Sequence, residues 1–282
     1  MNYILCNPKS KNGEGQKKLD EFLENKEREY KIVSVLDKVD YASILADTTA
    51  EDEIVIIGGD GTLNHFINDV KNLKINCKVY FLSSGTGNDF LNDLGKKAED
   101  GKIQINEYLE NLPVVIVNGK EYRFINGVGY GIDGYCCEVG DELREKTTKP
   151  VNYTSIAIKG LLFHYKAPNA KVTINGETKE YKRVWLAPTM KGKYYGGGMI
   201  IAPDQDRLDP DHYVTTVVMH GSGKLKTLMV FPSIFKGAHV KHTEMLDIIK
   251  THEVEVEFDR PTALQIDGET IKGVTSYKVI AK

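Results

Sequence analysis

The sequence predicts an α/β domain followed by a mostly antiparallel β domain. In the first third of the chain, short apolar runs alternate with helical patterns, which is typical of a parallel sheet covered by helices. After about Pro113, segments of alternating polar and apolar residues take over, and Asn175-Gly176 is a hairpin signal. A chain of 282 residues is also long enough for two domains, at about 100–200 residues each.

Apolar runs mark the expected strands of the first domain. Four short and nearly continuous runs fit strands that are buried on both faces, over residues 3–6, 32–35, 53–57 and 79–82. Apolar residues at helical spacing lie between and after them, over residues 16–28, 41–45 and 63–70. In the second domain a single helix is expected over residues 151–165, among strands that include 172–174, 213–219 and 254–258. There we expect a β-sandwich or a flattened barrel.

Composition and charge exclude several classes of protein. Lys and Arg number 37 against 40 Asp and Glu, and the resulting net charge of -3 argues against nucleic acid as the main partner. The sequence lacks the roughly 18-residue apolar stretch of a membrane span, and its start lacks the features of a secretory signal. Its four cysteines have no metal-ligand spacing and fit buried thiols in a reducing compartment. We therefore expect a cytoplasmic protein.

Three polar turns follow three of the predicted strands. They cover residues 7–13, 58–64 and 84–90, and two of them are rich in glycine. Ligands of an open parallel sheet bind outside the carboxyl ends of its strands, where glycine lets backbone N–H groups approach a phosphate closely. The three turns predict a polyphosphate ligand. The alternative is that the glycines only permit tight turns and that Asp60 caps a helix.

The motifs in these turns, and others further along, resemble those of the diacylglycerol kinase catalytic family, which includes bacterial soluble lipid kinases, ceramide kinases and sphingosine kinases. The matching segments are NPKS at 7–10, GGDGTLN at 58–64, SSGTGNDF at 83–90, NGVGYGID at 126–133, YGGGM at 195–199, GAH at 237–239 and DGE at 267–269. The resemblance implies a nucleotide-binding α/β domain related to phosphofructokinase and NAD kinase, over residues 1–122. It implies a lipid-binding β-sandwich over 123–271, with 272–282 returning to the first domain.

By that resemblance the chain transfers the γ-phosphate of ATP to a lipid hydroxyl, with diacylglycerol as the first choice and ATP in the cleft between the domains. Phosphate contacts are then assigned to the glycine turns, namely Gly58, Gly59, Asp60, Gly61, Thr62, Leu63, Asn64, Gly85 and Thr86. The base or ribose side is assigned to Asn7, Pro8, Lys9, Ser10 and Lys11. Asp60 and Asp133 are the candidates for organising the magnesium ion and its waters.

The resemblance assigns proton abstraction from the lipid hydroxyl to Asp267 and Glu269. The two residues are two apart, so in an extended segment both side chains face the same way, and we expect Asp267 to be the base. The alternative is that Asp267-Gly268 is simply a hairpin turn.

A second magnesium site is implied in the acidic run that begins at Asp204. Asp209 takes the carboxylate position, and Asp206 and Asp211 supply backbone carbonyls. Pro210 stands where the family usually has glycine, and proline fixes φ near −65°. The alternative is a solvated acidic loop without a metal.

Two rival functions remain open at this stage. NAD kinases share GGDGT and the two-domain plan, and a catalytically idle nucleotide or lipid sensor would explain Pro210 and the missing arginine after Phe90. A lipid kinase also needs a membrane-facing surface, for which the segment Lys159–Lys166 is the best candidate, although such a stripe is more often a core helix. A homodimer is left open.

Overall fold

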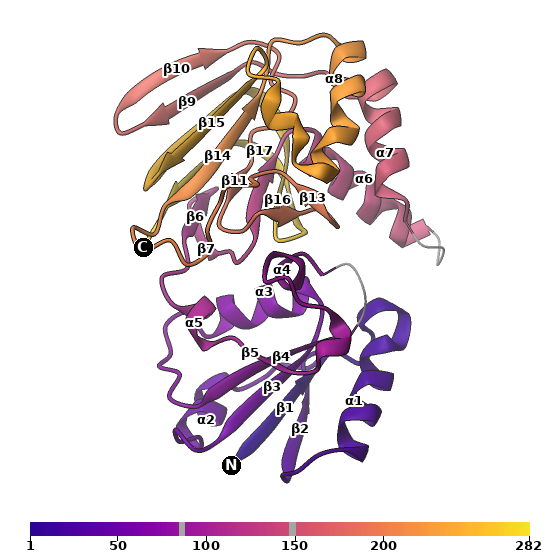
Figure 1. The fold of residues 1–282 in the computed structure, drawn as a ribbon, viewed down its shortest axis with the longest axis vertical. Helices are drawn as coiled ribbons and strands as arrows, with labels where there is room; N and C mark the ends of the chain where they lie inside the picture. The colour runs from indigo at the N-terminus through magenta and orange to yellow at the C-terminus, as the bar shows by residue number, and fades with distance from the viewer. Residues whose placement is uncertain (85–87, 147–150) are drawn as a thin grey trace. The chain divides into compact units, whose positions relative to one another are not determined.

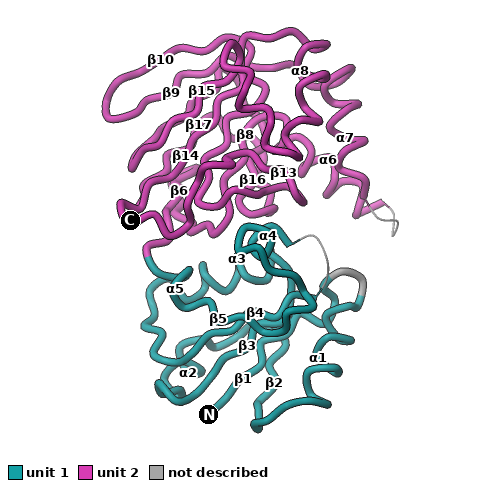
Figure 2. Tube along the Cα trace, in the orientation of Figure 1, with its two compact units in different colours: residues 1–110 teal, residues 111–282 magenta. Residues whose placement is uncertain are grey.

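The computed structural model describes residues 1–84, 88–146 and 151–282, and these residues form two compact units. Unit 1 is Met1–Glu110 and unit 2 is Asn111–Lys282 (Figure 2). The division lies before the strand that starts at Val114, so the expected boundary at residue 122 was placed too late. Residues 114–117 and 120–123 form a hairpin, and its first strand pairs with the last strand of the chain at residues 278–280. This hairpin therefore belongs to unit 2.

Unit 1 is built on a five-stranded sheet in the order β2-β1-β3-β4-β5 (Figure 1). Its first four strands are parallel, as predicted, while β5 runs antiparallel to β4. At two residues, β5 is too short to leave a sequence pattern. The strands are β1 (Asn2–Cys6), β2 (Tyr30–Ser34), β3 (Glu53–Gly58), β4 (Lys78–Ser83) and β5 (Ile103–Gln104).

Short helices connect these strands and cover the sheet. They are η1 (Ser10–Gly13), α1 (Glu14–Glu24), α2 (Tyr41–Ala46), α3 (Asp60–Asp69), α4 (Asp89–Asp93), η2 (Ala98–Asp100) and α5 (Asn106–Leu109). Leu19 of α1 packs with Ile4, Val55 and Leu82 of the sheet, which explains the helical spacing of its apolar residues. Both α3 and α4 begin directly after a strand and its turn, so their N-termini lie at the carboxyl ends of β3 and β4.

Unit 2 contains a ten-stranded sheet in which all pairings are antiparallel, as predicted. The long strand β16 pairs with β9 along its first half and with β8 along its second, with register shifts against β17 between Glu257 and Leu264. The strands are β6 (Val114–Val117), β7 (Lys120–Arg123), β8 (Gly127–Tyr130), β9 (Ala170–Ile174), β10 (Glu177–Tyr181), β11 (Thr189–Met190), β14 (Val214–Met219), β15 (Leu246–Thr251), β16 (Glu253–Ile266) and β17 (Glu269–Ile280). A separate two-stranded ribbon joins β12 (Tyr194–Tyr195) to β13 (Met199–Ile200).

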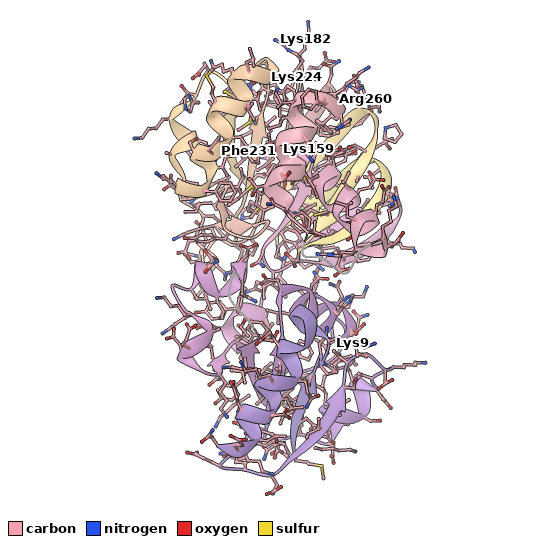
Figure 3. The ribbon with its side chains drawn as sticks, turned by 90° about the vertical axis from the view of Figure 1, so that its right-hand side faces the viewer. Lys9, Lys159, Lys182, Lys224, Phe231 and Arg260 are labelled. Carbon is pink, nitrogen blue, oxygen red and sulfur yellow. The ribbon has the colours of Figure 1, made fainter. Side chains whose placement is uncertain are left out.

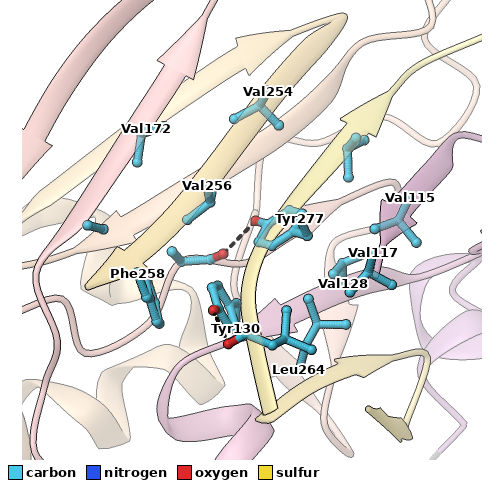
Figure 4. Packing of buried hydrophobic residues seen from close by; sticks show 14 of the residues in the cluster. Val115, Val117, Val128, Tyr130, Val172, Val254, Val256, Phe258, Leu264 and Tyr277 are labelled. Carbon is cyan, nitrogen blue, oxygen red and sulfur yellow. Dashed lines mark hydrogen bonds between the residues drawn. The ribbon is translucent and has the colours of Figure 1, made fainter. Parts of the chain in front are cut away.

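A cluster of buried aromatic and branched residues fills the interior of this sheet (Figure 4). The Tyr130 ring stacks on Phe258, with 3.9 Å between ring centroids, and its hydroxyl donates to Val274 O at 2.6 Å. Tyr277 of β17 donates in the same way to Ala187 O at 2.7 Å. Each buried hydroxyl therefore has an acceptor, which removes most of the penalty for burying it.

The last strand does not return to the first domain, contrary to expectation. Residues 272–280 lie within β17, which pairs with β16 and with β6 in unit 2. An apolar run predicts a strand but does not show which other strand it pairs with. The sequence therefore could not decide between the two sheets.

Helices cover part of unit 2, and Figure 1 shows three of them side by side. The three are α6 (Ile132–Lys146), α7 (Tyr153–Lys159) and α8 (Lys224–Val230). The other helical segments described in this unit are η3 (Gly160–His164), η4 (Phe231–Lys236) and η5 (Ala238–Lys241). The helix expected over 151–165 is present as α7 and η3, whereas α6 and α8 were not predicted. Within the described ranges, no helix is long and apolar enough to cross a membrane.

Candidate functional site

The three polar turns of unit 1 meet at the carboxyl ends of β1, β3 and β4. The Asn7 amide lies 3.4 Å from Thr62 Oγ1, and the hydroxyls of Ser10 and Ser84 lie 2.7 Å apart. Backbone bonds support the same contacts, because Ser84 N–H donates to Gly58 O at 2.9 Å. The sequence predicted only that each turn follows a strand. In the structure the turn 7–13 contacts both of the other turns.

Glycine is required inside two of these turn regions. A Cβ atom on Gly58 would clash with the side chain of Thr62, and one on Gly15 would clash with the carbonyl of Asn7. The clash at Gly15 is with backbone, which cannot rotate away. Each of these two glycines therefore makes room for a tight approach within its own segment, Gly58 inside the turn 58–64 and Gly15 between the start of α1 and the turn that begins at Asn7.

Asp60 links two of the turns through its carboxylate. Its oxygens accept the N–H groups of Asp89 at 2.9 Å and Phe90 at 3.2 Å, at the N-terminus of α4. The helix-capping role considered as an alternative is thus present. The role of Asp60 with magnesium stays a prediction, while Gly85 and Thr86, and the side chain of Lys11, lie outside what the structure describes.

Asp267 is a buried hairpin residue whose carboxylate accepts three backbone N–H groups. It accepts the N–H groups of Ile125 at 2.7 Å, Asn126 at 2.8 Å and Gly127 at 2.9 Å. Its own φ is 47° and that of Gly268 is 97°, so the segment is a turn between β16 and β17 and not an extended strand. The condition for Asp267 and Glu269 to face the same way is not met.

Glu269 lies in a different environment from Asp267. It is the first residue of β17 and its side chain is exposed, whereas Asp267 is only 9% exposed. The turn between them is fixed by Gly268 N–H, which donates to Gln265 Oε1 at 2.7 Å. Of the two carboxylates, Glu269 is therefore the one that an acceptor molecule can reach.

Asp133, in the first turn of α6, is a buried carboxyl group with few donors nearby. It is 8% exposed, and among the described residues neither of its carboxyl oxygens has a partner at hydrogen-bonding geometry. Burial raises the pKa of Asp133 to about 6, and the nearby Gly134 N–H and Tyr195 hydroxyl offset only part of that rise. A Cβ on Gly129 would clash with Asp133 Oδ2, so glycine at 129 leaves the space that this carboxyl group fills. Such a group is suited to hold a cation or to accept a hydroxyl.

Protein donors already surround the oxygens of the acidic loop that were assigned to a second magnesium. Asp209 Oδ1 accepts Asp211 N–H at 2.9 Å, and Lys250 Nζ lies 4.0 Å from Asp209 Oδ2. The carbonyl of Asp206 accepts Asp209 N–H at 3.3 Å, and that of Asp211 accepts the His252 ring at 2.6 Å. In the stretches of chain that the structure describes, no group of three or more His, Cys, Asp or Glu could hold a metal ion. These contacts fit the metal-free alternative better than a prepared magnesium site.

Sequence reasoning missed two buried cations beside this loop. The Arg207 guanidinium donates to Ile125 O and, at 3.0 Å, to Asn126 Oδ1, so it holds the same segment that Asp267 holds. Lys191 is 3% exposed, and burial together with Arg207 lowers its pKa. The sequence did offer one indication of Arg207, because it is the only basic residue within the acidic run 204–211.

Comparison with protein families covers both units. Residues 2–117 match the diacylglycerol kinase catalytic domain, and residues 126–279 match the YegS C-terminal NAD kinase beta sandwich-like domain. The chain belongs to the diacylglycerol kinase catalytic family. The lipid kinase family predicted from the motifs is thereby confirmed, as is an α/β domain followed by a β-sandwich.

Individual relatives agree with this family. A protein of Mycobacterium tuberculosis named diacylglycerol kinase is 25% identical over 218 residues, which cover 74% of this chain and 69% of the relative. A solved structure described as a diacylglycerol kinase from Bacillus anthracis has a TM-score of 0.62 at 18% identity, covering 99% of this chain and 93% of that one. Yeast NADH kinase in complex with NADH has a TM-score of 0.51 at 12% identity, covering 100% of this chain and 78% of that one. Both structural likenesses concern the fold alone.

Proposed function

We propose that this lipid kinase transfers the γ-phosphate of ATP to the free hydroxyl of diacylglycerol and so produces phosphatidic acid. The observation that carries the proposal is the contact between the three polar turns at the carboxyl edge of a parallel sheet. Ligands of such sheets bind at this edge, and the N–H groups of glycine turns and helix starts favour phosphate there. The name of the mycobacterial relative supports diacylglycerol as the acceptor.

Holding and neutralising the phosphates is the task of unit 1 in this proposal. Phosphoryl transfer depends on positioning and charge stabilisation more than on covalent chemistry. The backbone of residues 58–64 and the start of α3 supply N–H groups and the positive end of a helix dipole. Magnesium bound with ATP would offset the charge of the phosphates. Carboxylate oxygens are ligands that magnesium prefers, so Asp60 of unit 1 stays the first candidate for holding it, and the role of Asp133 with magnesium stays a prediction as well.

Glu269 is the general base in this proposal, in place of Asp267. Three N–H groups occupy the Asp267 carboxylate, whereas Glu269 is exposed at the start of the next strand. The Glu269 carboxylate takes the proton of the acceptor hydroxyl as the new oxygen–phosphorus bond forms and the bond to ADP breaks. Asp267 acts as a positioning residue, because it holds the 125–127 segment and the turn that leads to Glu269.

Labelled ATP tests this proposal directly. Purified protein is incubated with [γ-³²P]ATP and magnesium, and with diacylglycerol in mixed micelles, ceramide, sphingosine or NAD in separate reactions. We expect label in phosphatidic acid, and none above background on NAD. Label on NAD, or ATP binding without any transfer, would favour one of the two rival functions instead. Matched reactions with Glu269→Gln and Glu255→Gln separate enzymatic transfer from contamination, since only the first should lose it.

A further inference from the structure

Three large apolar side chains of unit 2 project into solvent. Phe163 and Leu225 are each 72% exposed and Met229 is 75% exposed, while the other exposed large apolar side chains in the described ranges reach at most 58%. Leu225 and Met229 are four residues apart on α8 and therefore lie on one side of it. Lys224 Nζ donates to Leu162 O at 3.0 Å, which ties α8 to the helical turn that carries Phe163. The three side chains thus belong to one patch on α8 and η3.

Positive charge surrounds this patch. Residues 151–170 and 220–243, which contain α7, η3, α8, η4 and η5, hold no Asp or Glu although acidic residues outnumber basic ones in the whole chain. The same two segments hold six lysines, namely Lys159, Lys166, Lys224, Lys226, Lys236 and Lys241. Of these, Lys226 pairs with Glu244 at 2.8 Å. Figure 3 shows Lys159 and Lys224 on one face of unit 2, with Arg260 nearby.

Buried side chains anchor this basic-apolar face to the protein core. Leu161 is fully buried and Tyr165 is 6% exposed, so neighbours of Phe163 in the same segment pack inward. Phe231 and Ile234 do the same for the segment after α8. The segment 159–166 is therefore core on one side and exposed on the other. Phe163, Leu225 and Met229 are therefore carried by well-packed segments, while their own side chains make little contact with the core of unit 2.

We propose that this basic-apolar face is the surface by which the kinase docks on a bilayer that contains anionic lipids. Lysines are attracted to anionic headgroups, and large apolar side chains enter the boundary between headgroups and acyl chains. The inference rests on the proposed function, because a diacylglycerol acceptor is dissolved in such a bilayer. A second copy of the chain fits the face poorly, since a symmetric contact would bring its lysines against the same lysines.

Vesicle flotation measures the docking. The protein is mixed with vesicles of phosphatidylcholine alone or with phosphatidylglycerol added, at low and high salt. We expect binding to the anionic vesicles that weakens with salt, because exposed charges are screened beyond about 8–10 Å at physiological ionic strength. The combined variant Phe163→Ser, Leu225→Ser and Met229→Ser should bind at least about tenfold more weakly, since it loses most of the exposed apolar area. The matched control changes Leu36, Leu73 and Ile248 to serine and should bind like wild type.

Kinase assays on two forms of diacylglycerol separate this inference from the proposed function. The triple variant should lose activity on long-chain diacylglycerol in vesicles and keep it on a short-chain, monomeric diacylglycerol. If the triple variant binds and phosphorylates like wild type in both assays, the docking surface is wrong. The docking surface is also wrong if the wild-type protein is a dimer, the triple variant is a monomer, and both bind vesicles equally well. If the face is needed for vesicle binding but no lipid is phosphorylated in either form, the proposed function fails and the docking surface stands.

Discussion

Asp267 and Asp133 are both buried in unit 2, yet their surroundings differ completely. Three backbone N–H groups donate to the Asp267 carboxylate, whereas the Asp133 carboxyl group has no donor at hydrogen-bonding geometry among the described residues. Hydrogen bonds offset the desolvation of a buried charge, and at Asp133 the nearby Gly134 N–H and Tyr195 hydroxyl offset only part of it. The comparison teaches that the partners of a buried aspartate, more than its motif, show whether it supports the fold or serves a ligand.

Breaking the Asp267 network should have the largest effect on stability. Asp267→Asn replaces one acceptor oxygen by an NH₂ group that faces N–H donors, and it removes the charge that all three bonds use. We expect the free energy of unfolding to fall by about 4 kcal/mol, since each unsatisfied buried group costs about 1–3 kcal/mol. Urea denaturation measures the change, with the exposed Asp204→Asn as the control. An Asp267→Asn variant as stable as the control would show that the network is not a structural anchor.

Asp133→Asn should change stability in the opposite direction. Burial raises the folded-state pKa of Asp133 to about 6, so the folded state favours the protonated form. The stabilisation from this group is fully present below the unfolded pKa, near 4, and is lost as pH rises through about 6. The asparagine variant should therefore be more stable than wild type by about 3 kcal/mol at pH 8, and equal to it below pH 4. Melting curves across this pH range test the sign, and a pH-independent difference would contradict it.

The acidic loop should respond least. Because its oxygens are engaged by protein donors and by Lys250, added magnesium has no prepared site at Asp209. We expect the melting temperature without nucleotide to be the same with magnesium and with a chelator. A rise with magnesium that Asp209→Ala removes would show instead that the loop binds the metal despite Pro210.

The features that the sequence predicted depend on local patterns, and those that it missed depend on distant partners. Apolar runs and turn residues indicated the strands of unit 1 and the turns after them, since periodicity and glycine act locally. The pairing of β17 with β6 joins residues far apart in the chain, and no local pattern records it. The donors of Asp267 likewise lie 140 to 142 residues away, so the sequence suggested a base where the structure has an anchor.

The most direct test of the account is the turnover of Glu269→Gln beside that of wild type and of Glu255→Gln, on diacylglycerol with labelled ATP. Loss of a general base typically lowers the rate by about 10²–10⁴-fold. We expect a loss of that size for Glu269→Gln, with an unchanged melting temperature because the side chain is exposed, and with ATP affinity close to that of wild type. Turnover of Glu269→Gln near that of wild type would contradict the assignment of the base.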